Sequence, residues 1–107
     1  MTPTGGLPAR RRAGKDALVR TRRRLIVHGR VHGVGFRVAV ARRAESLGLG
    51  GSVRNRPDGT VEILAEGDDH AVESLVRFAR EGPRAASVTR VEESSEEAGD
   101  LTRFEIE

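Results

Sequence analysis

Short apolar runs predict four strands and a brief fifth one. Leu25, Ile26 and Val27 follow one another directly, as in a buried strand. Later apolar positions alternate with polar ones, which is the pattern of a strand with one buried face. The predicted strands cover residues 24–30, 52–55, 60–65 and 88–92, with Phe104 and Ile106 in a short edge strand.

Two stretches have apolar residues three and four positions apart, the spacing of one face of a helix. Gly48 follows the first stretch and Gly82-Pro83 follows the second, as helix C-termini prefer. Asp68 and Asp69 offer an N-cap and a favourable charge to the second helix. The apolar faces consist of Phe36, Val40, Ala44 and Leu47 in the first helix and of Val72, Leu75, Val76 and Ala79 in the second.

The order of these elements defines the fold class. Arg56-Pro57-Asp58-Gly59 reads as a tight turn, since Pro presets φ and Gly closes the turn, so the second and third strands form a hairpin. The order β-α-β-β-α-β predicts an α+β, ferredoxin-like βαββαβ sandwich, in which one antiparallel sheet carries two helices on one face. We expect residues 93–100, which are acidic and polar, to form a surface loop.

Charge divides the chain into two parts. Residues 1–24 carry eight cations and one anion, a net +7, whereas residues 25–107 carry eleven arginines and fifteen acids, a net −4. Residues 1–22 show no hydrophobic period, so we expect a disordered basic N-terminal extension there and the folded domain over residues 23–107. The extension is either a solvated tail, which an early start codon would also produce, or an arm that touches nucleic acid or another acidic surface.

Composition excludes several classes of chemistry. The 107 residues contain no cysteine, which rules out disulfides, thiol nucleophiles and thiolate metal sites. No apolar run approaches the ~20 residues of a membrane span, and no apolar segment follows the N-terminal arginines as a secretory signal requires. We therefore expect a cytoplasmic protein, and a monomer because no long apolar patch is evident.

The stretch from Gly29 to Arg37 is rich in glycine and joins a predicted strand to a predicted helix. Glycines let such a loop curl so that successive N–H groups form an anion site, which the helix N-terminus supports. Arg37 can add a planar set of donors to a phosphate. The loop is neither a P-loop nor a dinucleotide-binding loop. On the loop alone, a tight packing turn with a solvated Arg37 is an equal alternative.

Two motifs resemble those of the acylphosphatases. VHGRVHGVGFR, residues 27–37, is similar to the family's V-x-G-x-V-Q-G-V-x-F-R, and GSVRNRPDGTVE, residues 51–62, matches its G-x-V-x-N-x-x-D-G-x-V-E. EGPRAASVTRVE, residues 81–92, is similar to the family's second helix exit and fourth strand. The resemblance covers roughly residues 24–107 and implies the same ferredoxin-like sandwich that the pattern predicts independently.

The resemblance also implies a reaction and the residues that perform it. The chain is expected to hydrolyse the carboxyl-phosphate anhydride of acyl phosphates to carboxylate and phosphate, with no cofactor or metal. Arg37 would bind the phosphate and Asn55 would orient the attacking water; without the motif, Asn55 would more simply be a hairpin residue that bonds its own backbone. The phosphate-binding loop would consist of the amides of His32, Gly33, Val34, Gly35 and Phe36, together with that of Arg37.

His32 stands where the family usually has Gln. The change matters little if only the backbone N–H contacts phosphate, whereas a side-chain contact would alter the pH dependence. His28 and His32 do not share a helix and His70 is distant in the sequence, so we expect no metal site. The acids at positions 92, 93, 96 and 97 are expected to be a solvated loop, not paired catalytic carboxylates.

Two other functions compete with hydrolysis. The RNA-recognition fold shares this topology, and Gly33-Val34-Gly35-Phe36 faintly resembles its aromatic motif, but that motif belongs on a strand. A non-catalytic nucleic-acid-binding module would therefore depend on the basic N-terminal arm. The domain also resembles the first domain of larger carbamoyl-transfer proteins of hydrogenase maturation. The absence of a second domain in this sequence leads us to expect a free-standing enzyme that acts on a small-molecule acyl phosphate.

Overall fold

A computed structural model describes residues 19–107 and confirms the predicted order of elements. The predicted extension over residues 1–22 lies outside the described residues as far as residue 18. Residues 20–22, which the prediction places in the extension, are the first residues of a strand that begins at Arg20. The elements are β2 (Arg20–Arg30), α1 (Phe36–Ser46), β3 (Gly50–Asn55), β4 (Val61–Asp68), α2 (Asp69–Glu81), β5 (Ser87–Glu96) and β6 (Phe104–Ile106).

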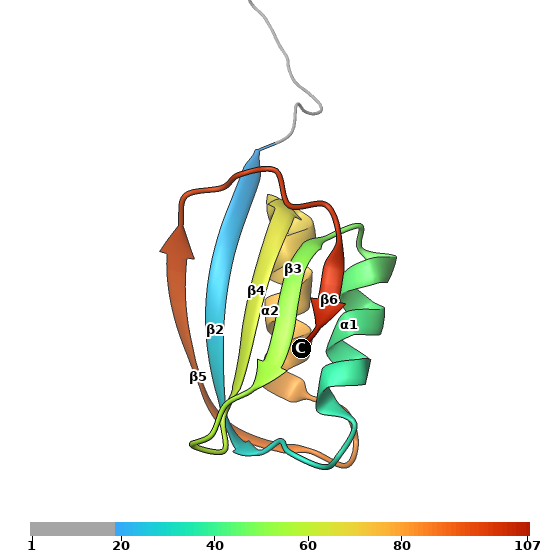
Figure 1. Ribbon diagram of the computed structural model, residues 1–107, viewed down its shortest axis with the longest axis vertical. Helices are drawn as coiled ribbons and strands as arrows, with labels where there is room; N and C mark the ends of the chain where they lie inside the picture. The colour runs from blue at the N-terminus through green and yellow to red at the C-terminus, as the bar shows by residue number, and fades with distance from the viewer. Residues whose placement is uncertain (1–18) are drawn as a thin grey trace, which may run out of the picture.

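The five strands form one sheet in the order β5-β2-β4-β3-β6. β2 pairs antiparallel with β4 and β5, and β3 pairs antiparallel with β4, but β6 pairs parallel with β3. The four longer strands thus form the predicted antiparallel sheet, and the short C-terminal edge strand makes the sheet mixed by pairing in parallel. Residues 97–103 cross the end of the sheet from β5 at one edge to β6 at the other (Figure 1). The direction of β6 is therefore opposite to that of β5 and the same as that of β3.

Both helices cover the same face of the sheet, and the core lies between these two layers (Figure 1). The apolar helix faces predicted from the sequence are buried, except for Leu47, which follows the last residue of α1 and is half-buried. Leu25, Val27, Val53 and Ile63 face them from the sheet and are fully buried. Each such side chain contributes about 1.5–3 kcal/mol of transfer free energy. Within residues 19–107 no helix is long and apolar enough to span a membrane.

β5 is longer than predicted, because residues 93–96 continue the strand instead of forming a loop. These positions hold no large apolar side chain, and ion pairs to neighbouring arginines hold them in the sheet. Glu93 bonds Arg23 at 3.0 Å and Glu96 bonds Arg24 at 2.6 Å. The predicted solvated acid cluster is thus largely a row of strand residues paired with arginines.

Glu66 is a carboxylate buried in the sheet, with no exposed side-chain area. Arg20 Nη2 and Arg22 Nε each donate to it at 2.7 Å, and the Leu101 amide donates at 3.2 Å. Burial raises the pKa of Glu66, but the hydrogen bonds from Arg20, the Gly99 amide, Arg22 and the Leu101 amide outweigh burial and lower it to about 2. A domain boundary at residue 23 would remove the two arginines that hold this carboxylate.

This buried carboxylate predicts a specific loss of stability in acid. A group whose pKa falls on folding, here from 4.5 to about 2, stabilises the native state above the unfolded pKa, and that stabilisation is lost as the pH falls through the folded pKa. Between pH 7 and pH 3 the loss from Glu66 is about 2 kcal/mol. Urea unfolding at both pH values should therefore show a smaller decrease for Glu66→Gln than for wild type. An equal decrease in the two proteins would contradict this account.

Candidate active site

Two buried side chains hold the glycine-rich loop between β2 and α1. Val31 is 2% exposed and Phe36 is 1% exposed, so both ends of the loop are fixed in the core. Gly33 and Gly35 between them have φ of 71° and 76°, a left-handed conformation that other residues adopt only with strain. The sequence therefore curls at the surface here, in the type of turn that forms anion-binding concavities of backbone N–H groups.

The N-terminus of α1 lacks both a side-chain cap and an acidic residue in its first turn. Its N-cap is Gly35, no side chain bonds the first amides, and the first turn contains no acidic residue. The first N–H groups of a helix have no partner within the helix, and the helix dipole makes this end positive. Arg37 adds a full positive charge in the same turn, so the end of α1 favours an anion.

A small pocket brings the two predicted catalytic side chains together. It has a volume of about 100 Å³ and is lined by residues of the loop, of the first turn of α1 and of the end of β3. This is more room than one water needs and less than the roughly 300–1,000 Å³ of pockets for drug-sized ligands. A phosphoryl-sized group suits it. The lining residues are Val31, Gly33, Gly35, Phe36, Arg37, Val38 and Asn55.

Asn55, the last residue of β3, has a buried Oδ1 without a hydrogen-bond partner. Buried polar atoms almost always have a partner, so an unpartnered amide oxygen in this pocket points to a ligand or a water. This observation argues against the simpler interpretation of Asn55 as a hairpin residue that bonds its own backbone.

Arg37 is half-buried, and its Nη1 donates to the main-chain oxygen of Glu107 at 2.7 Å. That contact holds the guanidinium at the pocket while most of its five donors remain available. The contact joins residues 70 positions apart and has no signal in the sequence. His32, also in the loop, bonds the carbonyl oxygen of Thr60 through its side-chain Nε2 at 2.9 Å.

The three histidines have separate surroundings. The His28 side chain is hydrogen-bonded to Glu92 at 2.6 Å, and the His32 side chain is hydrogen-bonded to the carbonyl oxygen of Thr60. His70 lies in the first turn of α2. Across the described part of the chain, no three His, Asp or Glu side chains are grouped so that they could hold a metal ion.

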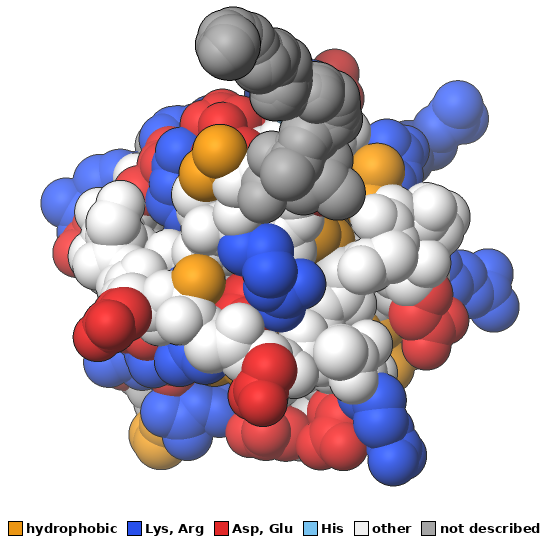
Figure 2. Space-filling view, turned by 90° about the horizontal axis from the view of Figure 1, so that it is seen from above, with side chains coloured by type: hydrophobic (Ala, Val, Ile, Leu, Met, Phe, Trp, Pro, Cys, Tyr) orange, Lys and Arg blue, Asp and Glu red, His pale blue; other side chains and the backbone are white. Residues whose placement is uncertain are grey.

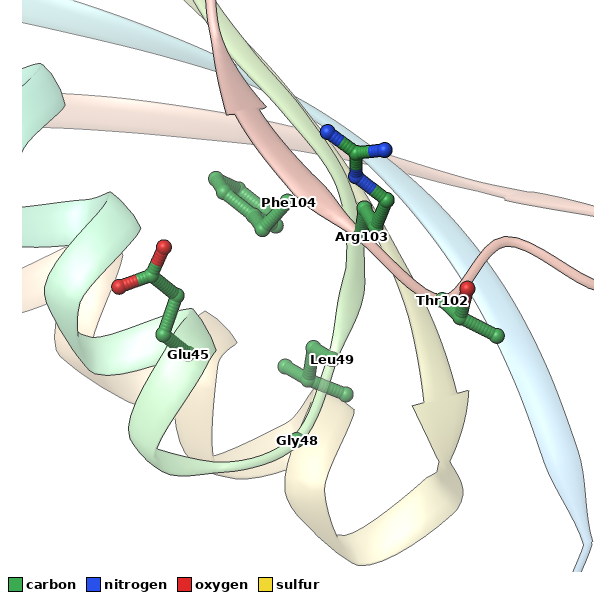
Figure 3. A pocket seen from close by; sticks show the side chains of 6 residues that line it. All are labelled: Glu45, Gly48, Leu49, Thr102, Arg103 and Phe104. Atoms are coloured by element: carbon green, nitrogen blue, oxygen red, sulfur yellow. The ribbon is translucent and has the colours of Figure 1, made fainter.

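A larger pocket, of about 390 Å³, lies at the opposite end of α1. Figure 3 shows Glu45 on one side of it and Phe104 and Arg103 on the other. It contains none of the predicted site residues and no glycine-rich loop that leads into a helix. The smaller pocket is therefore the candidate site. The larger one is lined by Glu45, Gly48, Leu49, Thr102, Arg103 and Phe104.

The fold and this pocket together define a ferredoxin-like domain with a small pocket at the uncapped start of α1. The family model named Acylphosphatase matches residues 23–106. An acylphosphatase of Thermococcus kodakarensis is 51% identical over 87 residues, which cover 81% of this chain and 96% of that protein. The chain therefore belongs to the acylphosphatase family, whose members are enzymes that act on acyl phosphates.

Solved structures agree with this assignment. The crystal structure of acylphosphatase from Bacillus subtilis superposes with a TM-score of 0.77 at 41% identity, covering 80% of this chain and 97% of that one. Full-length HypF, in its phosphate- and nucleotide-bound form, contains a similar domain, with a TM-score of 0.75 at 25% identity. The match covers 88% of this chain but only 12% of HypF.

Proposed function

We propose that this chain hydrolyses acyl phosphates by binding the phosphoryl group on Arg37 and the loop amides of residues 32–37 while Asn55 orients the attacking water. The observation that carries the proposal is the unpartnered, buried Oδ1 of Asn55 in the same small pocket as Arg37. The Arg37 guanidinium is suited to bind an anion, and the Asn55 Oδ1 can accept a hydrogen bond from water.

Phosphoryl transfer requires positioning and electrostatic stabilisation more than covalent chemistry. Charge builds up on the phosphoryl oxygens, and fixed donors aimed at them stabilise it. The Arg37 guanidinium supplies a planar pair of donors, and the uncapped first turn of α1 supplies amides and a positive dipole. The loop that carries these groups is anchored at both ends by Val31 and Phe36, which are buried in the core.

Asn55 positions the nucleophile but does not deprotonate it. Its Oδ1 accepts a hydrogen bond from the water, whose oxygen lone pair then faces phosphorus. The water oxygen forms a bond to phosphorus, the bond from phosphorus to the acyl oxygen breaks, and the electron pair leaves with the carboxylate. The water proton passes to a phosphoryl oxygen. A carboxylic acid has a pKa near 4, so its conjugate base is a good leaving group without a general acid.

The nucleic-acid-binding alternative finds little support in the described residues. Aromatic side chains on the open face of the sheet would be needed to stack bases. All three phenylalanines instead lie in the core or pack against it (Phe36, Phe78 and Phe104). The face seen in Figure 2 also shows acidic and basic side chains intermixed, without a continuous basic surface. The basic segment before residue 19 lies outside the described residues.

Hydrolysis of benzoyl phosphate by the purified full chain tests the proposal. We expect enzyme-dependent release of benzoate and phosphate that is unchanged by EDTA, because no step requires a metal. A folded wild-type protein without activity would reject the proposal. Tight, salt-dependent binding of a DNA or RNA oligonucleotide by the same inactive preparation would then favour the alternative.

A further inference from the structure

We propose that His32 is a positioning residue, which holds the phosphate-binding loop against the hairpin turn that follows Asn55. This inference rests on the proposed function, because it concerns how the two halves of that site keep their relative positions. Arg37 and the loop lie on one segment of the chain, whereas Asn55 lies on another. The His32 side chain reaches from the first segment to the second.

The contact is a hydrogen bond with defined polarity. His32 Nε2 lies 2.9 Å from the carbonyl oxygen of Thr60. A carbonyl can only accept, so Nε2 carries the proton and donates. The same oxygen also accepts the Arg56 amide at 2.8 Å, and Arg56 directly follows Asn55. One carbonyl therefore connects the loop to the backbone that carries the water-orienting side chain.

The turn between Asn55 and Thr60 is stiff enough to transmit this contact. Asp58 Oδ1 accepts the Thr60 amide at 3.0 Å and the Thr60 hydroxyl at 2.5 Å. The Gly59 amide donates to the Arg56 carbonyl at 3.1 Å. Thr60 is only 6% exposed, so it is packed against the rest of the domain. A shift of Thr60 relative to the loop would therefore move Arg56 and, with it, Asn55.

The loop has little else to fix its distance from this turn. Within residues 19–107, the His32 bond is the one hydrogen bond that joins loop residues 32–35 to turn residues 56–60. The loop is anchored at its ends by Val31 and Phe36, and it contains two left-handed glycines between them. Loss of the His32 bond should therefore change the separation of the phosphoryl group from the water, without removing any group that touches either.

Kinetics of benzoyl phosphate hydrolysis separate this role from phosphate binding. His32→Ala should lower kcat roughly 10- to 100-fold, the cost of a misplacement of about 1 Å. The inhibition constant of inorganic phosphate should stay within about threefold of wild type, because Arg37 and the amides remain. His32→Gln should restore kcat to within about threefold of wild type, since the Gln amide can donate the same bond. His70→Ala, at an exposed position on α2, is the matched control.

A double-mutant cycle tests whether His32 acts through Asn55. In an Asn55→Ala background, His32→Ala should lower kcat by less than about threefold, because there is no positioned water left to misplace. A full additional loss would overturn the inference, and so would an unchanged kcat in His32→Ala or a phosphate affinity that falls as much as kcat. If His32→Ala melts below the assay temperature, His32→Leu replaces it, since Leu fills the space but cannot donate. An inactive wild type rejects the proposed function itself, whereas an active wild type with an equally active His32→Ala rejects this inference alone.

Discussion

Replacement of Arg37 by Ala is expected to lower kcat/KM for benzoyl phosphate by at least ~100-fold, the scale of losing one main donor to a transition-state oxyanion. The guanidinium lies in a pocket lined by the uncapped start of α1, by two positive-φ glycines and by Asn55, whose buried Oδ1 has no partner. Its loss leaves the amides to bind the phosphoryl group without a full positive charge.

Arg37→Lys separates charge from geometry. Lysine keeps the positive charge but replaces the planar pair of donors by a single point charge, so we expect it to recover part of the lost activity and no more. Arg42→Ala is the matched control, because Arg42 is an exposed arginine on the same helix. If Arg37→Ala were as active as Arg42→Ala, Arg37 would not bind the phosphoryl group. Melting curves for each variant will show whether loss of the contact with Glu107 has destabilised the fold.

Replacement of Asn55 by Ala is expected to lower kcat by about 100-fold, which corresponds to loss of a positioned nucleophile. The inhibition constant of inorganic phosphate should hardly change, since Asn55 is not assigned to bind the phosphoryl group. Removal of the side chain also removes an unsatisfied buried oxygen, so the variant should be at least as stable as wild type. Reduced activity with undiminished stability is the combination that a catalytic role predicts and a structural role does not.

Asn55→Asp and Ser52→Ala complete this test. Asp has nearly the same shape, but its negative charge beside the phosphoryl group should weaken phosphate binding as well as kcat. Ser52 lies on the same strand outside the pocket, so its replacement should leave both quantities close to wild type. An Asn55→Ala variant with wild-type kcat would remove Asn55 from the mechanism.

The sequence predicted those parts of the fold that depend on hydrophobic periodicity. The spacing of Val40 and Ala44 in α1, and that of Val72 and Leu75 in α2, identified the buried helix faces, because burial of one face imposes that spacing. The second half of β5 lacked this signal, since ion pairs with arginines take the place of apolar packing there. The direction of β6 depends on the path of residues 97–103 around the sheet, which no local pattern encodes.

In the candidate site too, the sequence indicated some residues but not the contacts that hold them. The sequence motifs led to Arg37 and Asn55, and the structure places both in one pocket. The contacts that hold them, from Arg37 to Glu107 and from His32 to Thr60, join residues that are 70 and 28 positions apart. Such contacts depend on tertiary packing and leave no pattern in the chain. The burial of Glu66 also has no signal in the sequence, because an acidic side chain is normally exposed. Its burial depends on Arg20 and Arg22, which are distant in the sequence.

Hydrolysis of benzoyl phosphate in oxygen-18 water tests the central claim most directly, because it identifies the atom that the water attacks. If Arg37 and the loop amides hold the phosphoryl group and Asn55 directs water at phosphorus, the label must enter inorganic phosphate and the released benzoate must remain unlabelled. The wild-type enzyme with EDTA and an enzyme-free control, analysed by mass spectrometry of both products, are sufficient. Label in benzoate would mean attack at the acyl carbon and would contradict the assignment of both residues.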